Sequence, residues 1–145
     1  MSASAKRRRD LRRRRYDAAT RPQFRGLRRT YPLTPEGVER ALTALGRTSG
    51  AVAGRMAALG IRGQLDNDCD CPIGRYLPAV VPGLERVSVG STEAFVSGWE
   101  HDDLGFTVHF GPMHISLPEA VTDFIEAFDA ERYPELIEEV KPHVG

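Results

Sequence analysis

The spacing of apolar residues changes twice along this chain, and that change does most to define its fold. From Thr34 to Gly60, apolar residues recur at intervals of three and four, which predicts two helices that end at Gly46 and Gly60. Thr34 is suited to cap the first helix, and Pro35 is suited to its first position. We expect these helices to form an N-terminal helical hairpin.

After Pro82-Gly83, apolar and polar residues alternate, as is typical of strands with one buried face. The clearest segment is LGFTVHFGPMHISL, residues 104–117. We interpret Gly111-Pro112 as a two-residue type II′ turn, because glycine tolerates a positive φ at its first position. This register predicts six apolar side chains on the face toward the helices: Phe106, Val108, Phe110, Met113, Ile115 and Leu117.

In the C-terminal part, apolar residues again recur at the spacing of a helix. Ser116 and Glu119 have the spacing of a capping box ahead of an apolar stripe that ends at Phe128. Pro134 then separates a shorter second helix. Helices, an antiparallel β-hairpin or meander, and then helices again predict an α+β fold. The 145 residues suffice for one such domain, which we place at residues 31–145.

The zero net charge conceals two oppositely charged parts. Residues 1–30 hold 12 of the 20 lysines and arginines and two acids, a net charge of +10, and the remainder carries −10. The N-terminal part has few large apolar residues, so we expect a disordered basic arm. Guanidinium groups suit phosphate oxygens, so this arm predicts nucleic-acid binding. The predicted contacts are its arginines: Arg7, Arg8, Arg9, Arg12, Arg13, Arg14, Arg15, Arg21, Arg25, Arg28 and Arg29.

Two other interpretations of the charge pattern stay open. The arm is alternatively a solvated tail without a binding role. The acidic C-terminal helices alternatively define a protein-interaction module for a basic partner, although charged residues are also usual on the solvated face of such helices. The acids concerned are Glu119, Asp123, Glu126, Asp129, Glu131, Glu135, Glu138 and Glu139.

The stretch QLDNDCDCPIGRYL, residues 64–77, holds both cysteines of the chain and raises the question of a metal site. Asp66, Asp68 and Asp70 match the first ligand positions of a calcium loop. However, Cys71 replaces its glycine and Leu77 replaces its bidentate glutamate. A calcium-binding loop in this stretch would therefore lack two of the residues that it requires.

A zinc site would combine four residues, since structural zinc takes about four ligands. The predicted hairpin register places two histidines opposite each other, but C-x-C is not the usual ligand spacing. The candidates are Cys69, Cys71, His109 and His114.

A reactive thiol is a third reading of this stretch, because a helix N-terminus lowers the pKa of a cysteine. The adjacent aspartates have the opposite effect. The favoured interpretation is a helix start, in which Asp70 or Cys71 is the cap, Pro72 lies in the first turn and Pro78 limits the helix to about two turns. We therefore expect structural cysteines, no metal and no cofactor.

An enzyme is the third functional class considered, and we assign it no catalytic residue. The segment WEHDDLG places Glu100, His101, Asp102 and Asp103 in an expected loop between strands. Histidine and carboxylates can carry acid–base chemistry. A charged, solvated turn is the simpler interpretation, because no recognisable catalytic motif accompanies these residues.

The composition predicts a cytoplasmic protein without a membrane partner. No apolar run is long enough to cross a bilayer, and no apolar segment follows the basic N-terminal residues as it would in a secretory signal. Two cysteines do not make a disulfide framework.

Two motifs resemble a group of small uncharacterised proteins from actinobacteria and phages. The first is LGIRG, residues 59–63, followed by CPIGRYL, residues 71–77. The second is LPEAVTDFIEAFDAERYPEL, residues 117–136. The resemblance extends over about residues 36 to 140 and leaves out the arm. It implies no known activity and no functional residue.

Overall fold

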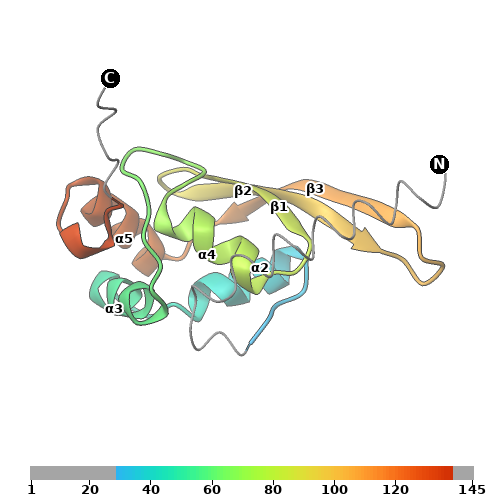
Figure 1. Ribbon diagram of the computed structural model, residues 1–145, viewed down its shortest axis with the longest axis horizontal. Coiled ribbons are helices and arrows are strands. Elements are labelled where there is room, and N and C mark those ends of the chain that lie inside the picture. The colour runs from blue at the N-terminus through green and yellow to red at the C-terminus, as the bar shows by residue number, and fades with distance from the viewer. Residues whose placement is uncertain (1–28, 139–145) are drawn as a thin grey trace, which may run out of the picture.

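The computed structural model describes residues 29–138, which form a mixed α/β fold (Figure 1). All predicted nucleic-acid contacts except Arg29 lie outside the described residues, as does Glu139. Within residues 29–138, four α-helices and one 3₁₀-helix accompany three strands. In chain order they are α2 Pro35–Thr43, α3 Ser49–Leu59, α4 Pro72–Val80, β1 Leu84–Val89, β2 Glu93–His101, β3 Thr107–Ser116, α5 Glu119–Asp129 and η2 Pro134–Leu136.

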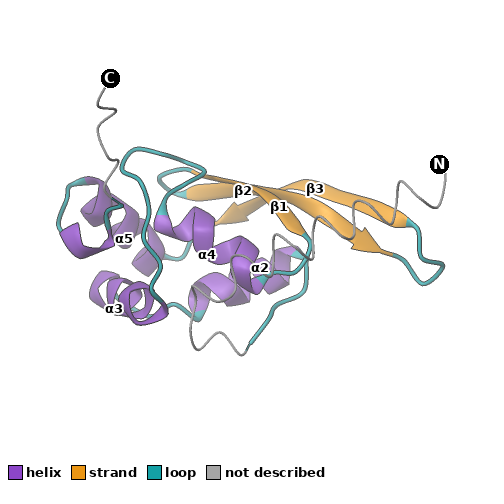
Figure 2. Ribbon diagram, in the orientation of Figure 1, coloured by secondary structure: helices purple, strands orange, loops and turns teal. Residues whose placement is uncertain are grey.

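The three strands form one antiparallel sheet in the order β1-β2-β3, and the helices lie against one of its faces (Figure 2). This arrangement confirms the predicted mixed fold with an antiparallel meander. None of the helices in the described range 29–138 has the length and apolar character needed to cross a membrane.

The first two helices begin and end as their sequences predict. The Thr34 hydroxyl accepts a hydrogen bond from the Gly37 N–H at 3.0 Å, and the Thr48 hydroxyl does the same for the Ala51 N–H at 3.1 Å. Gly60 ends α3 in the left-handed conformation with φ 72°. Helix α3 then packs against α5. The arrangement of α2 and α3 as a hairpin stays a prediction.

The predicted turn at Gly111-Pro112 is wrong, because both residues lie inside one continuous strand, β3, and are joined by a cis peptide bond. Val96 pairs with Met113 and Gly98 with Phe110, so two residues of β3 face one residue of β2. This is a β-bulge, a position that tolerates a proline without an N–H group.

The turn that joins β2 to β3 spans Asp102 to Phe106 and overlaps the segment WEHDDLG, where a loop between strands was expected. A carboxylate oxygen of Asp102 accepts hydrogen bonds from the N–H groups of Leu104, at 3.0 Å, and Phe106, at 2.8 Å. Gly105 supplies the positive φ of 82°. This turn satisfies the backbone groups at the end of the hairpin, so the chain reverses here, before Gly111-Pro112.

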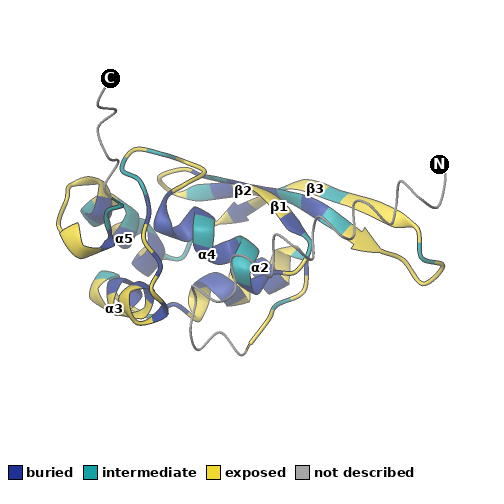
Figure 3. Ribbon diagram, in the orientation of Figure 1, coloured by how far each residue is buried: buried dark blue, intermediate teal, exposed yellow. Residues whose placement is uncertain are grey.

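The corrected register changes which side chains are buried. Of the six predicted to face inward, Ile115 is buried, whereas Phe106 is 66% exposed and Val108 is 40% exposed. Figure 3 shows that the exposed end of the β2–β3 hairpin extends beyond the helices. The others are only partly buried against the core: Phe110, Met113 and Leu117.

The C-terminal elements also differ in detail from the prediction. Ser116 belongs to β3, and α5 begins at Glu119 after Pro118 without a side-chain cap, so the predicted capping box is absent. The helix expected after Pro134 is a single 3₁₀ turn, η2, over the described residues. Phe124 nevertheless stacks on Phe128 and on Tyr133, with ring centroids 5.9 and 5.6 Å apart.

One apolar core joins the helices to the inner face of the sheet. Its buried residues run from Leu33 to Leu136. The Tyr76 hydroxyl enters this core and donates a hydrogen bond to the Ala41 carbonyl oxygen at 2.8 Å. Burial raises the pKa of the Tyr76 phenol, so this donor keeps its proton at neutral pH.

Candidate functional site on the open face of the sheet

The cysteine stretch is a helix start, as its sequence favours. Cys71 is the N-cap of α4, and its sulfur accepts a hydrogen bond from the Gly74 N–H at 3.3 Å. Pro72 occupies the first position of the helix. Helix α4 continues through Pro78 and ends at Val80, slightly later than predicted. The Asn67 side chain shapes the preceding loop, because its oxygen accepts hydrogen bonds from the Cys69 and Asp70 N–H groups at 3.0 and 2.8 Å.

Burial makes Cys71 a poor nucleophile. Desolvation raises the pKa of its thiol to about 11, and the negative charge of Asp129 adds to this effect. The hydrogen bonds from the Gly74 and Ile73 N–H groups lower the pKa but are outweighed. Cys69, in contrast, is exposed.

We expect iodoacetamide at about pH 8 to modify the native chain once, at Cys69, because Cys69 is exposed to the reagent, whereas burial shields Cys71 and raises the pKa of its thiol. Intact-mass spectrometry over time measures the number of adducts, and peptide mapping locates them. The chain unfolded in denaturant serves as the control and should take two adducts. Equal rates of modification at Cys69 and Cys71 in the native chain would contradict the burial of Cys71.

The zinc candidates do not form the arrangement that the predicted hairpin required. His109 and His114 both lie on β3, opposite Trp99 and Phe95 respectively, and not opposite each other. Within residues 29–138, no three histidines, cysteines or acids are grouped suitably for a metal ion. The acidic segment around the β2–β3 turn also has a structural role, because Asp102 organises that turn.

The open face of the sheet brings together aromatic rings that the sequence did not single out. Phe95 contacts His114 with ring centroids 5.2 Å apart, and Trp99 contacts His109 at 4.7 Å. Phe95 is 46% exposed. None of the described helices covers this face, because they all pack on the other side of the sheet (Figure 2).

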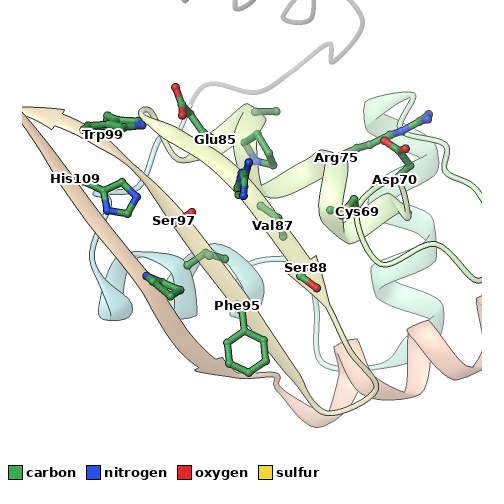
Figure 4. Close-up of a pocket in the computed structure, with 16 residues that line it drawn as sticks. Cys69, Asp70, Arg75, Glu85, Val87, Ser88, Phe95, Ser97, Trp99 and His109 are labelled. Atoms are coloured by element: carbon green, nitrogen blue, oxygen red, sulfur yellow. The ribbon is translucent and has the colours of Figure 1, made fainter.

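A groove of about 1140 Å³ runs from these rings toward helix α4. Figure 4 shows Phe95, Ser97 and Trp99 along β2 and Cys69 and Arg75 on the opposite side. The groove is wide, with aromatic side chains at the sheet and polar ones near α4. Such a surface can hold an extended chain bearing flat or charged groups.

The charged residues that line the groove are two acids, Asp70 and Glu85, and two arginines, Arg75 and Arg86. No lysine or arginine occurs between Val87 and Glu131, a range that includes all of β2 and β3. Glu85 and Glu93 contribute carboxylates, and Glu93 forms an ion pair with His114. Arg86 is opposite Ser97 and adds one positive charge to the groove.

Arg75, at the far side of the groove, forms an ion pair with Glu138 that lowers the pKa of the glutamate. The guanidinium group also donates a hydrogen bond to the Arg62 carbonyl oxygen at 3.1 Å. Arg75 therefore fastens the C-terminal end of the described chain to α4. Its charge is already matched within the domain.

The sequence predicted a strand in this region, but the aromatic residues on the outer face of β2 were not recognised as a possible site. Phe95, Ser97 and Trp99 alternate with three buried residues of the same strand: Ala94, Val96 and Gly98. This pattern indicates a strand with two different faces. The aromatic side chains lie on the face away from the core, where large apolar groups need another explanation than folding.

No protein-family model, curated protein or solved structure matches this chain. The resemblance to small actinobacterial and phage proteins stays a prediction. The function must therefore be inferred from the charges and the geometry of the chain itself.

Proposed function

We propose that this chain is a nucleic-acid-associated accessory protein whose arginine-rich N-terminal arm binds phosphates. The observation that carries the proposal is the opposite charge of the arm and the domain. Residues 29–138 contain 17 acidic and eight basic residues, a net charge of −9, while residues 1–28 contain 11 basic and two acidic residues. Phosphate-directed binding by the whole chain must therefore come from the arm.

The packing of the domain supports this division of roles. Among the described residues, the apolar core runs from Leu33 to Leu136, and none of its members is an arginine. The planar guanidinium groups of the arm can make paired hydrogen bonds to phosphate oxygens. Because phosphates are the same at every position, such binding should show little preference for base sequence.

A protein-interaction module is the second candidate, and the surface of α5 favours it. Glu119, Asp123 and Glu126 are exposed at helical spacing on α5, and Asp129 ends the same helix. A basic partner protein would match this surface. The same acids also serve as the solvated face of an amphipathic helix, so the first proposal remains the principal one.

We expect the variant R12Q/R13Q/R14Q/R15Q to bind a labelled DNA or RNA duplex at least about 100-fold more weakly than the wild type at 0.1 M salt. The matched control is R40Q/R47Q/R55Q/R62Q, which removes the same charge from four exposed arginines of the domain. This control should stay within about threefold of the wild type, since its arginines are not in the arm. Fluorescence anisotropy titrations measure both affinities. Equal weakening of the two variants would refute binding through the arm, and capture of a protein partner that resists nuclease would favour the second candidate.

A further inference from the structure

We propose that the arm also docks on the domain of its own chain, along the aromatic and acidic open face of the sheet. Its arginines stack there on Phe95 and Trp99 and pair with carboxylates of the same surface. We call this surface the docking face and define it by Glu85, Glu93, Phe95, Trp99 and His109. The docking itself is independent of nucleic acid, and its regulatory consequence rests on the proposed function.

The chemistry of the docking face selects arginine among the common side chains. Aromatic rings attract a cation placed over their faces, and the flat guanidinium group can stack on a ring while its edge binds a carboxylate. Phe95 is 46% exposed, and the carboxylate of Glu93 lies two residues before it on the same strand face. Ring and carboxylate are therefore neighbours, as arginine requires.

The charges around the docking face favour a strongly basic occupant. Glu100 and Asp103 add exposed acids at the end of the β2–β3 hairpin. Strands β2 and β3 contain no lysine or arginine, and Arg86 of β1 is the basic residue of the described strands on this face. The arm is the most basic part of the chain, with eleven basic residues among the first 28. The attraction between the two is long-ranged at low salt and weakens when salt screens it.

Four residues after Arg29, the last arginine of the arm, the described chain passes close to the backbone at the Trp99 end of the sheet. The Tyr31 N–H donates a hydrogen bond to the Val80 carbonyl oxygen at 2.8 Å, which fixes the start of the described chain. Leu33 lies beside Gly83, where an added Cβ would be 3.5 Å from the leucine side chain. The Gly83 carbonyl oxygen in turn accepts a hydrogen bond from the Trp99 N–H at 2.9 Å.

A short part of the arm is long enough to follow the docking face. Ten extended residues span about 33 Å, which matches the length of about 30 Å expected for a nine-residue strand such as β2. Arg21, Arg25 and Arg28 lie within ten residues of Arg29. Tethering at this distance gives the arm an effective concentration of the order of millimolar, so a weak interaction suffices for occupancy.

Docking makes the domain a competitor of nucleic acid for the arm. Phosphates and the docking face would bind the same guanidinium groups, so each occupant weakens the other by the same factor. The docking face would then lower the affinity of the arm for nucleic acid. This regulation exists only if the arm binds phosphates as proposed above.

Trp99 is the only tryptophan of the chain, so its fluorescence reports on the docking face directly. We expect the acrylamide quenching constant of Trp99 in the full chain at low salt to rise about twofold in the variant R21Q/R25Q/R28Q, which loses the stacked arginines. The control R40Q/R47Q/R55Q carries the same change in charge and should match the wild type. Raising the salt to about 1 M should bring the wild type to the value of the arm variant.

A second variant tests the other partner in the contact. E85Q/E93Q leaves the arm intact but removes carboxylates of the docking face, and it should raise the quenching constant at low salt as the arm variant does.

Equal constants for the wild type and both variants at low salt would overturn the proposal. Dependence of the wild-type constant on protein concentration would also overturn it, because the occupant would then be the arm of a second copy. The assay contains no nucleic acid, so failure here leaves the proposed function standing, and failure of duplex binding leaves the docking standing.

Discussion

Raising the salt concentration from about 50 to about 200 mM should weaken duplex binding by the full chain by about 10³- to 10⁴-fold. Neutralising phosphates releases condensed counterions, and if about five to eight arginines contact phosphates, log K falls with log salt at a slope of about −5 to −7. Anisotropy titrations across a salt series measure this slope. A binding constant that ignores salt would contradict an arginine–phosphate interface.

Single substitutions measure how much each arginine contributes to this salt dependence. Replacing one contacting arginine of the arm by alanine should make the slope shallower by about one, with little dependence on base sequence. Arg40→Ala, in α2 of the domain, is the control and should leave the slope unchanged. A peptide of residues 1–28 should bind more tightly than the full chain at low salt, because the acidic domain no longer competes for its arginines.

Replacing Phe124 by alanine should lower the free energy of unfolding by about 3–5 kcal/mol, the usual cost of removing a fully buried phenyl ring. Phe124 has no exposed surface and stacks on Phe128 and Tyr133, so a cavity would open between α5 and the residues that follow it. Urea denaturation measures the loss. The matched control is Phe95→Ala, which removes the same ring from the docking face and should cost less than about 1 kcal/mol.

Comparing the loss of stability in these two variants tests whether the open face of the sheet is separate from the folding core. If Phe95→Ala destabilised the chain more than Phe124→Ala, the open face would be part of the folding core and not a recognition surface. The docking experiment would then lose its basis, since Phe95 would not be available to a cation.

The helix starts could be predicted because they depend on neighbouring residues. Thr34 with Pro35, and Cys71 with Pro72, each place a capping atom next to a proline that fits the first turn, and both were recognised. A loop was expected at WEHDDLG, residues 99–105, where the β2–β3 turn lies, but a second turn was wrongly predicted at Gly111-Pro112. Gly111-Pro112 matched a two-residue turn locally, but Asp102 made two backbone hydrogen bonds that only the folded hairpin reveals.

The docking face could not be predicted because its definition depends on which side of the sheet the helices cover. Phe95 and Trp99 alternate with small or aliphatic residues, and either set could have faced the core. The basic arm was evident from composition, yet the partner surface on the same chain required the register of β2 against β3. Local sequence signals thus predicted the helices and strands, whereas tertiary packing determined which face of each is buried.

The bulge at Gly111-Pro112 has a consequence for solubility. β3 is an edge strand, and a regular edge offers a row of free backbone groups to which strands of other molecules can add, as in aggregates. The extra residue breaks that row, and Pro112 has no N–H to contribute. At the opposite edge, the Val89 N–H of β1 donates to the Asp68 carbonyl oxygen at 2.8 Å, so the cysteine loop covers that end. The bulge in β3 and the hydrogen bond at the end of β1 thus each reduce the backbone groups that an edge offers to an added strand.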